Sequence, residues 1–503
     1  MNFPSGQAMK LSSITFGIIT IIFVLSFAAP INAQNATVQI TVLSLVPAKI
    51  KVEGKIKDGV HIWSFRQSYA GITGLGQRID KFELMTTNGE TLHSKKLAPG
   101  EYETESAATN FSYEVKLDPP FDTSDSAYIS WLTQERGLFL LGDLLPSFLS
   151  ETKSIEQINF DFALPSEWQV ASVEREVAKR KFEVENVARA VFAIGPNLRI
   201  KHERIGNMEF DFVTNGEWMF ADEDALEMAT KVLKEHIAAF GDTPQRKAML
   251  YLSQFPRSFG AQRWSAETRG RTVVLLSGKM PTKLSALIHL SSPLTHELFH
   301  LWLPNSLALD GDYDWFYEGF TIYQALRTGM RLNYFAFQDY LDALGRAYNA
   351  YQSEPRRDTL SLPDASRQRW LGENTIVYNK GMLVAFLYDL TLMQNSKGKR
   401  SLDDVLRELF TKHNSAKARA DGNSAVIEIL VQYKGMKEFV NRYIEKPITI
   451  DLQTMLAPFG LILEREGSKT RVRVHPTISR SQRALLKKFG YNDNLPQVSL
   501  NHQ

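Results

Sequence analysis

The segment THELFH carries the pattern that most constrains this chain, since His296 and His300 are four positions apart and Glu297 follows the first of them. Ser292 and Pro293 suit the N-cap and first turn of a helix, so we predict a short helix that begins there. Histidines at this spacing share one helix face and can bind one metal ion. Glu297 lies about 100° further round, where its carboxylate can reach a water molecule without being a ligand. The pattern therefore predicts two metal ligands and a general base.

A catalytic zinc site needs a third protein ligand and one open position. Glu318, in DWFYEGFTIYQ, lies 18 positions after His300, an interval that fits a helix, a loop and a return helix. Two other zinc layouts are excluded. Leu303 and Ser306 occupy the places of the Gly and His in HExxHxxGxxH, and Ile322 occupies the place of the Asp that follows the glutamate ligand in thermolysin. We therefore expect one zinc ion per chain, with Glu318 as the third ligand.

Hydrolysis of an amide at such a site also needs a hydrogen-bond donor for the developing oxyanion. Tyr378, in TIVYNKGMLVAFLYDL, is a candidate because a neutral phenol can donate to that oxygen. The alternative is an ordinary core tyrosine on an amphipathic helix. Glu297 would take a proton from the attacking water and return it to the leaving amine. The residues thus indicate a zinc-dependent peptide hydrolase, with a non-catalytic zinc-binding interaction protein as the alternative.

Composition limits the classes of fold and partner. A chain of 503 residues is too long for one compact core and predicts several domains. Lys and Arg number 58 against 56 Asp and Glu, so the charge balance gives no reason to expect a nucleic-acid partner. The absence of cysteine excludes disulfides and thiolate metal sites. We expect the partner to be a peptide or protein substrate.

The N-terminus is typical of an export signal. Lys10 precedes an apolar run at 14–29, and Ala33 offers a small residue at which a signal peptide, residues 1–33, can be cleaved. The alternative is an uncleaved membrane anchor, because the run is almost long enough to span a bilayer. We expect an exported protein, periplasmic or secreted, that contacts a membrane only through this segment if it stays attached.

The sequence pattern divides the rest of the chain into segments. From 34 to 200, short β-branched runs alternate with turn signals, which predicts a β-sandwich-like domain. Helical periods and strand-like runs mix in 201–320, and 321–448 is mostly helical. The segment 449–503 returns to strand-like alternation and a basic tail. We predict a multidomain α+β fold.

Several blocks of the sequence, between about residues 210 and 463, resemble the glycyl aminopeptidases, family sixty-one of the metallopeptidases: HELFHLW, WFYEGFTIY, YNKGMLVAFLYDL and GKRSLDDVLREL. These often PDZ-associated enzymes are thermolysin-like gluzincins related to alanyl-type aminopeptidases. The resemblance implies a thermolysin-like peptidase domain with a mostly helical second half, which follows the β-rich domain. It also implies roles for five residues: zinc ligands His296, His300 and Glu318, general base Glu297, and oxyanion donor Tyr378.

The chain departs from its relatives in two places. Alanyl-type aminopeptidases carry a Gly-x-Met-Glu-Asn segment whose glutamate binds the free amine of the substrate, and FGAQRWSAETRGRTVVLLS lacks it. Glu267 could substitute, but we expect it to be a solvated acid in a loop. Aminopeptidase activity is therefore the expectation, with endopeptidase activity on the same zinc site as the alternative. Roughly forty residues follow Leu463, so we expect no PDZ domain in the segment 449–503.

Overall fold

The computed structural model describes residues 35–492 apart from residues 152–156, 259, 261 and 415–417. The predicted signal peptide and the last residues of the predicted C-terminal segment lie outside the described residues. The described residues belong to one compact unit, which begins at Gln34.

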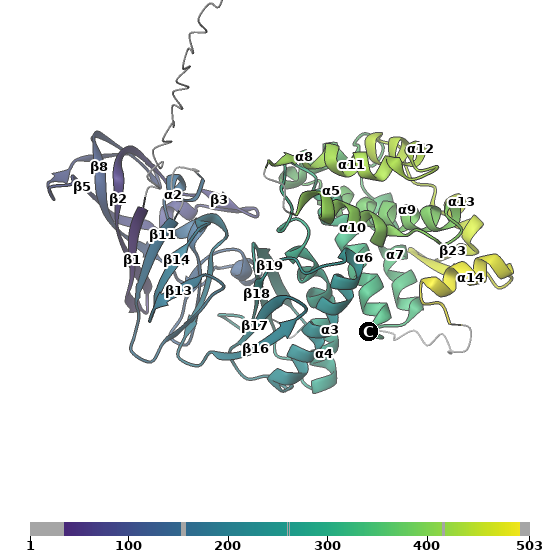
Figure 1. The fold of residues 1–503 in the computed structure, drawn as a ribbon, viewed down its shortest axis with the longest axis horizontal. Helices are drawn as coiled ribbons and strands as arrows, with labels where there is room; N and C mark the ends of the chain where they lie inside the picture. The colour runs from purple at the N-terminus through teal and green to yellow at the C-terminus, as the bar shows by residue number, and fades with distance from the viewer. Residues whose placement is uncertain (1–34, 152–156, 259, 261, 415–417, 493–503) are drawn as a thin grey trace, which may run out of the picture. The chain divides into compact units, whose positions relative to one another are not determined.

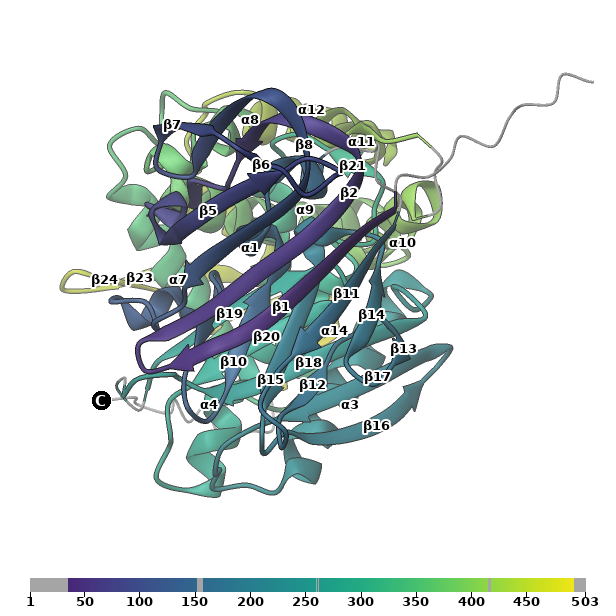
Figure 2. The ribbon, with the colours of Figure 1, turned by 90° about the vertical axis from the view of Figure 1, so that its left-hand side faces the viewer.

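The N-terminal part is built from β-strands, as predicted (Figure 2). Its long sheet has the order β13(Arg175–Ala178), β14(Lys181–Val184), β11(Gln157–Ala163), β1(Asn35–Leu45), β2(Ala48–Ser64), β8(Glu101–Lys116), β5(Ile79–Met85), β6(Thr91–Leu92), and β7(Ser94–Ala98) pairs with β8. A second sheet has the order β12(Gln169–Ala171), β15(Val191–Gly195), β10(Gly137–Leu140), β9(Trp131–Leu132). Phe162 of the long sheet and Phe192 of the short one share a core, with ring centroids 4.9 Å apart. The two sheets therefore form a sandwich.

A third sheet begins the part of the chain that carries the predicted metal ligands (Figure 1). Its order is β16(Arg199–Ile205), β17(Met208–Thr214), β18(Lys247–Gln254), β20(Thr272–Ser277), β19(Trp264–Arg269). The three inner strands are parallel, and both edge strands are antiparallel to their neighbours. One face shares a core with α3(Asp222–Phe240) and α4(Lys283–Glu297), and the other shares one with the short sheet of the sandwich. β19 is left as an edge strand beside α4.

The helix that carries the histidine pattern is longer than predicted. It begins at Lys283, where Thr282 accepts a hydrogen bond from the Ser285 amide at 3.1 Å, and Pro293 lies inside it. The prediction that the helix starts at Ser292 is therefore wrong. A proline in a helix interior costs about 3 kcal/mol, and burial of Leu290 and other apolar side chains around the proline offsets that cost.

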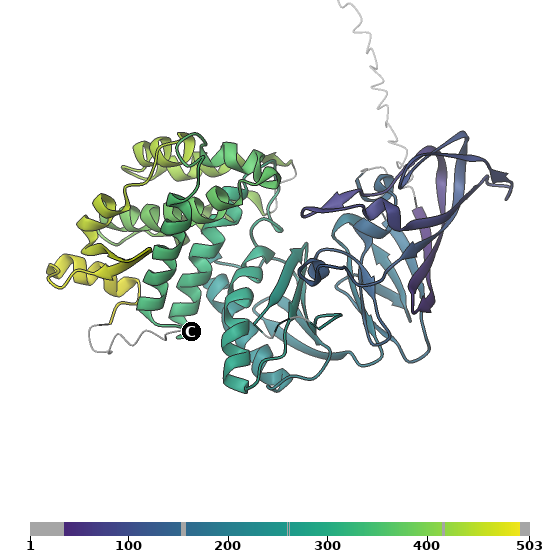
Figure 3. The ribbon, with the colours of Figure 1, turned by 180° about the vertical axis from the view of Figure 1, so that it is seen from behind.

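The second half of the chain is mostly helical, as predicted (Figure 3). It contains α5(Asp314–Tyr317), α6(Gly319–Arg331), α7(Phe337–Gln352), α8(Leu362–Arg367), α9(Gly381–Asn395), α10(Leu402–His413), α11(Gly422–Gln432), and then β23(Leu461–Glu466), β24(Lys469–Val474) and α14(Arg480–Lys488). The helical stretch from Ile376 to Asn395 is long and apolar enough to cross a membrane, but most of it is buried in the protein core. The multidomain α+β fold class is confirmed.

Two glycines let α6 and α9 touch beside the predicted third ligand. A Cβ on Gly319 would lie 2.6 Å from the Cα of Gly381, closer than real atoms approach. Gly319→Ala is therefore expected to lower the free energy of unfolding by roughly 1–3 kcal/mol, measured by urea denaturation. Gly260→Ala is the control, because its Cβ would meet nothing closer than 3.7 Å. Equal stability of the two variants would contradict this packing.

Candidate metal centre

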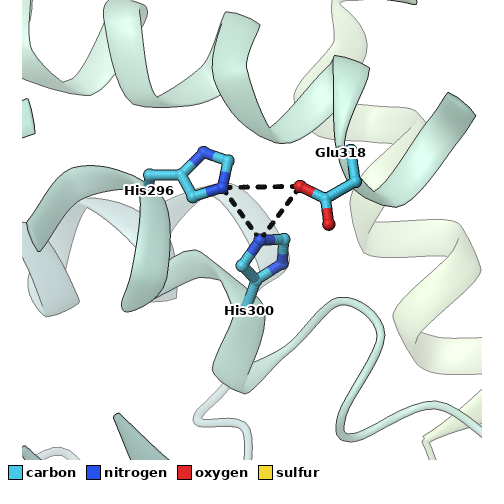
Figure 4. Close-up of side chains that lie close together, drawn as sticks. All are labelled: His296, His300 and Glu318. Carbon is cyan, nitrogen blue, oxygen red and sulfur yellow. Dashed lines mark hydrogen bonds and ion pairs between the residues drawn. The ribbon is translucent and has the colours of Figure 1, made fainter. Parts of the chain in front are cut away.

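The structure brings together the three side chains predicted to bind zinc (Figure 4). The Nε2 atoms of His296 and His300 lie 3.0 Å apart, and Glu318 Oε2 lies 3.5 Å from the first and 3.6 Å from the second. All three donor atoms lie within 4.8 Å of one another, and no backbone group separates them. Two imidazole nitrogens and one carboxylate oxygen are a common donor set of catalytic zinc. The residues present therefore fit a zinc ion.

Local structure aims each donor atom at this point. α4 carries His296 and passes into η4(Phe299–Leu301), a single 3₁₀ turn that carries His300. The Nδ1 of His300 lies 2.8 Å from the carbonyl oxygen of Leu303, so it donates there and leaves Nε2 facing the cluster. Glu318 stands at the junction where α5 ends and α6 begins.

Electrostatics at the centre favour a cation. Burial lowers the pKa of His300, but the hydrogen bond and charge of Glu318 outweigh it and raise that pKa to about 9. A proton on His300 then occupies the nitrogen that a metal ion would use. The buried carboxylate therefore attracts positive charge to the cluster, whether a proton or a metal ion carries it.

Glu297 lies next to the three clustered side chains without belonging to them. It is buried, and its Oε2 accepts a hydrogen bond from the Thr268 hydroxyl at 2.8 Å. The same hydroxyl also lies 2.9 Å from the Glu297 carbonyl oxygen. Thr268 thus fixes the carboxylate of the predicted base. The sequence carried no signal for Thr268, because the contact arises only when β19 lies beside α4.

Tyr378 lies on η6(Ile376–Lys380), a π-helical turn, and lines the same cavity as Glu297. Burial raises the pKa of its phenol, so it stays neutral. Its oxygen accepts a hydrogen bond from Nη2 of Arg369, which also lies 3.1 Å from Glu318 Oε1. Arg369, on η5(Arg369–Leu371), is a site residue that the sequence analysis missed.

These side chains line one cavity of about 870 Å³. The N-terminal domain contributes Tyr69 and Tyr128, and β19 contributes Trp264, Ala266 and Glu267. Helix α6 and the residues after it contribute an apolar wall: Ile322, Ala325, Leu326 and Phe335. The cavity can therefore contact a peptide on both sides of the predicted metal position.

Glu267 is placed differently from the prediction. It lies on edge strand β19 and faces the cavity, so the expectation of a solvated loop acid is wrong. Tyr69 donates to its Oε1 at 2.5 Å, and the Nε of Arg269 lies 3.7 Å away. Burial raises the pKa of Glu267. The reason for the difference is pairing with β20, in which Glu267 lies opposite Val274 and so becomes part of the sheet.

Comparisons with known proteins agree with this geometry. Residues 289–384 match the family model of the M61 glycyl aminopeptidases, whereas curated protein sequences yield no match. An aminopeptidase N family protein from Idiomarina loihiensis has a similar structure, with a TM-score of 0.72 and 19% identity over 86% of this chain and 79% of that one. An M1 zinc metallopeptidase from Deinococcus radiodurans gives a TM-score of 0.52 and 13% identity over 84% of this chain and 95% of that one.

At these identities the solved structures establish the fold alone, and the family model supports a peptidase. The same Deinococcus enzyme, as a variant bound to a Tyr-Ser-Ala substrate, has a TM-score of 0.54 and 12% identity over 84% of this chain and 95% of that one. The family match covers all five residues that the sequence analysis selected: His296, Glu297, His300, Glu318 and Tyr378. Residues 289–384 are thus similar to the M61 glycyl aminopeptidases, and this similarity supports a peptidase.

Proposed function

We propose that this chain is a zinc-dependent aminopeptidase whose general base is Glu297. The observation that carries the proposal is the convergence of His296, His300 and Glu318 on one point beside the carboxylate of Glu297. A non-catalytic metal-binding protein has no need of a buried base held by a hydroxyl, and Glu297 is held in this way by Thr268.

The chemistry divides between the ion and the chain. Zinc held by the three ligands would supply Lewis acidity, which lowers the pKa of a water molecule and polarises a carbonyl. Glu297 accepts the proton of the water as its oxygen bonds to the carbonyl carbon. When the carbon–nitrogen bond breaks, Glu297 delivers that proton to the leaving amine. Thr268 keeps the carboxylate in place throughout, because its hydroxyl donates to one oxygen and leaves the other free.

Tyr378 stabilises the carbonyl oxygen of the substrate during the same step. That oxygen gains negative charge when water adds, and a neutral phenol at the cavity wall can donate a hydrogen bond to it. The raised pKa of Tyr378 ensures that the donor keeps its proton at neutral pH. Its role is therefore to stabilise charge, while Glu297 transfers protons.

Glu267 supplies the argument for an aminopeptidase. β19 is the edge strand of its sheet, so an extended peptide can add beside it as a further strand. A carboxylate on that strand, within the cavity, can bind the α-ammonium group of such a peptide. Tyr69, the last residue of β3(Ser68–Tyr69), which pairs with β4(Ile72–Thr73), donates its hydroxyl to Glu267 and limits the room beyond it.

The proposal is tested with peptide reporters that differ only at the amino end. Peptides with a free amine are expected to be cleaved, whereas the N-acetylated forms are cleaved about 30- to 5,000-fold more slowly, because loss of a buried charge pair costs roughly 2–5 kcal/mol. A chelator is expected to stop cleavage of both. Equal rates on both forms would show an endopeptidase, and no cleavage of either would show a binding protein.

Glu267→Gln is expected to lower kcat/KM for free-amine peptides by about 100-fold, because the amide keeps the shape of the side chain but removes its charge. The rate on N-acetylated peptides should not change. Glu174→Gln is the control, since Glu174 is a carboxylate that is likewise close to an arginine, at 3.2 Å from Arg271, and is buried. A loss of equal size on both substrate classes would reject the role of Glu267 in binding the amine.

A further inference from the structure

One guanidinium group joins the metal ligand Glu318 to the phenol of Tyr378. Nη2 of Arg369 donates to the Tyr378 hydroxyl oxygen and lies 3.1 Å from Glu318 Oε1. Nη1 donates to Asp314 Oδ1 at 2.6 Å. Arg369 is buried, so water does not compete strongly for these contacts.

We propose that Arg369 is the positioning residue of this centre, aiming the Tyr378 proton at the substrate and one Glu318 oxygen at the metal. The proposal rests on the proposed function, because it assigns Arg369 a part in that reaction. Arg369 touches neither the reacting atoms nor the ion, and acts through the two side chains that do.

The direction of the hydrogen bond to Tyr378 carries the first half of the argument. A guanidinium group donates and never accepts, so the phenol oxygen must be the acceptor. The proton of Tyr378 is then free for another acceptor in the cavity. Two other phenols that line the cavity have no proton left to donate to a substrate, since Tyr69 donates to Glu267 and Tyr317 donates to Asp314 at 2.5 Å.

The second part of the proposal, that Arg369 orients the metal ligand, depends on the two oxygens of Glu318. Oε1 faces Arg369 at 3.1 Å, whereas Oε2 faces His296 and His300. A carboxylate paired on one oxygen presents the other in a fixed direction, because the hydrogen-bond partners of a metal ligand orient it. Arg369 therefore sets which oxygen of Glu318 is offered to the ion.

The surroundings hold the guanidinium in this orientation. Asp314 is itself buried, and it binds both Arg369 and the Tyr317 hydroxyl. The indole ring of Trp370 lies under the guanidinium, 4.6 Å from ring centroid to Cζ. A lysine cannot reproduce this arrangement, because its ammonium is a point charge without the planar fork of arginine.

Arg369→Met is expected to lower kcat by about 100-fold, the loss typical of one oxyanion donor, with KM changed less than about threefold. A phosphinic transition-state analogue should lose affinity by the same factor as kcat. Zinc affinity, measured by competition with a chromogenic chelator, should fall about 10- to 100-fold. Arg369→Lys should recover part of each loss, and serves if the methionine variant does not fold.

The double variant Arg369→Met with Tyr378→Phe decides whether Arg369 acts through Tyr378. At saturating zinc, the double variant should be no slower than Tyr378→Phe alone, because the phenol is then already absent. Multiplying losses, or an unchanged kcat in Arg369→Met, would overturn the proposal.

Arg356→Met is the matched control for loss of an arginine contact in the same segment as Arg369. Arg356 pairs with Glu373 at 2.6 Å and donates to Gln368 beside Arg369, but it does not line the cavity. This variant should lower the melting temperature and leave kcat and zinc affinity unchanged. Cleavage of peptides by the wild-type protein without metal would refute the proposed function. A zinc-dependent Arg369→Met variant with the kcat of the wild type would refute only the role of Arg369.

Discussion

Replacing Glu297 with glutamine is expected to lower kcat by about 10²–10⁴-fold, the usual contribution of a general acid–base, while zinc binding stays intact. The amide keeps the volume of the side chain, and its oxygen can still accept the Thr268 hydrogen bond. It cannot take a proton from water. Because Glu297 is outside the ligand cluster, the ion should remain bound.

Two measurements on the Glu297→Gln variant separate catalysis from metal binding. Metal analysis of the purified protein should give about one zinc per chain, and kcat on a free-amine reporter should show the loss. A conservative Glu297→Asp variant keeps the carboxylate on a shorter side chain and should retain more activity than the glutamine variant. Full activity of Glu297→Gln would contradict the assignment of the base.

Loss of a metal ligand is expected to abolish peptidase activity altogether. In His300→Ala, zinc affinity should fall by more than the roughly 10- to 100-fold that is lost when a residue that orients a metal ligand is removed. The reason is that one of three donors is gone and Glu318 then faces a single imidazole. The measurements are zinc competition and reporter cleavage, with circular dichroism to monitor folding.

His413→Ala is the control for burial of a histidine. His413 is about as buried as His300, at 6% exposure against 7%, but it belongs to α10 and does not line the cavity. The control should keep zinc and activity. Retention of tight zinc binding by His300→Ala would contradict the ligand set.

The parts of the centre that depend on local spacing could be predicted from the sequence. His296 lies at the end of α4 and His300 on the 3₁₀ turn that follows, and their Nε2 atoms still meet, so neither the error in the helix start nor the early end of the α-helix disturbed the prediction. The predicted helix start was wrong because it rested on the local preference of Pro293 for the first turn of a helix. The fold extends the helix back to Lys283, since the preceding turns bury side chains such as Leu290.

The contacts that orient those residues could not be predicted, because they join segments far apart in the chain. Thr268 reaches Glu297 only after β19 pairs with β20 and packs beside α4. Arg369 reaches Glu318 across 51 positions of sequence through a turn that carries no catalytic motif. Glu267 lies among turn-forming residues, and only the sheet register shows that it faces the cavity.

The most direct test of the central claim is a zinc titration of metal-free protein in which bound zinc and the rate of peptide cleavage are measured together. The rate should rise in proportion to bound zinc and level off at about one ion per chain. Glu297→Gln should bind the same amount and stay almost inactive. Cleavage by the metal-free protein, or a rate that does not follow bound zinc, would contradict the account.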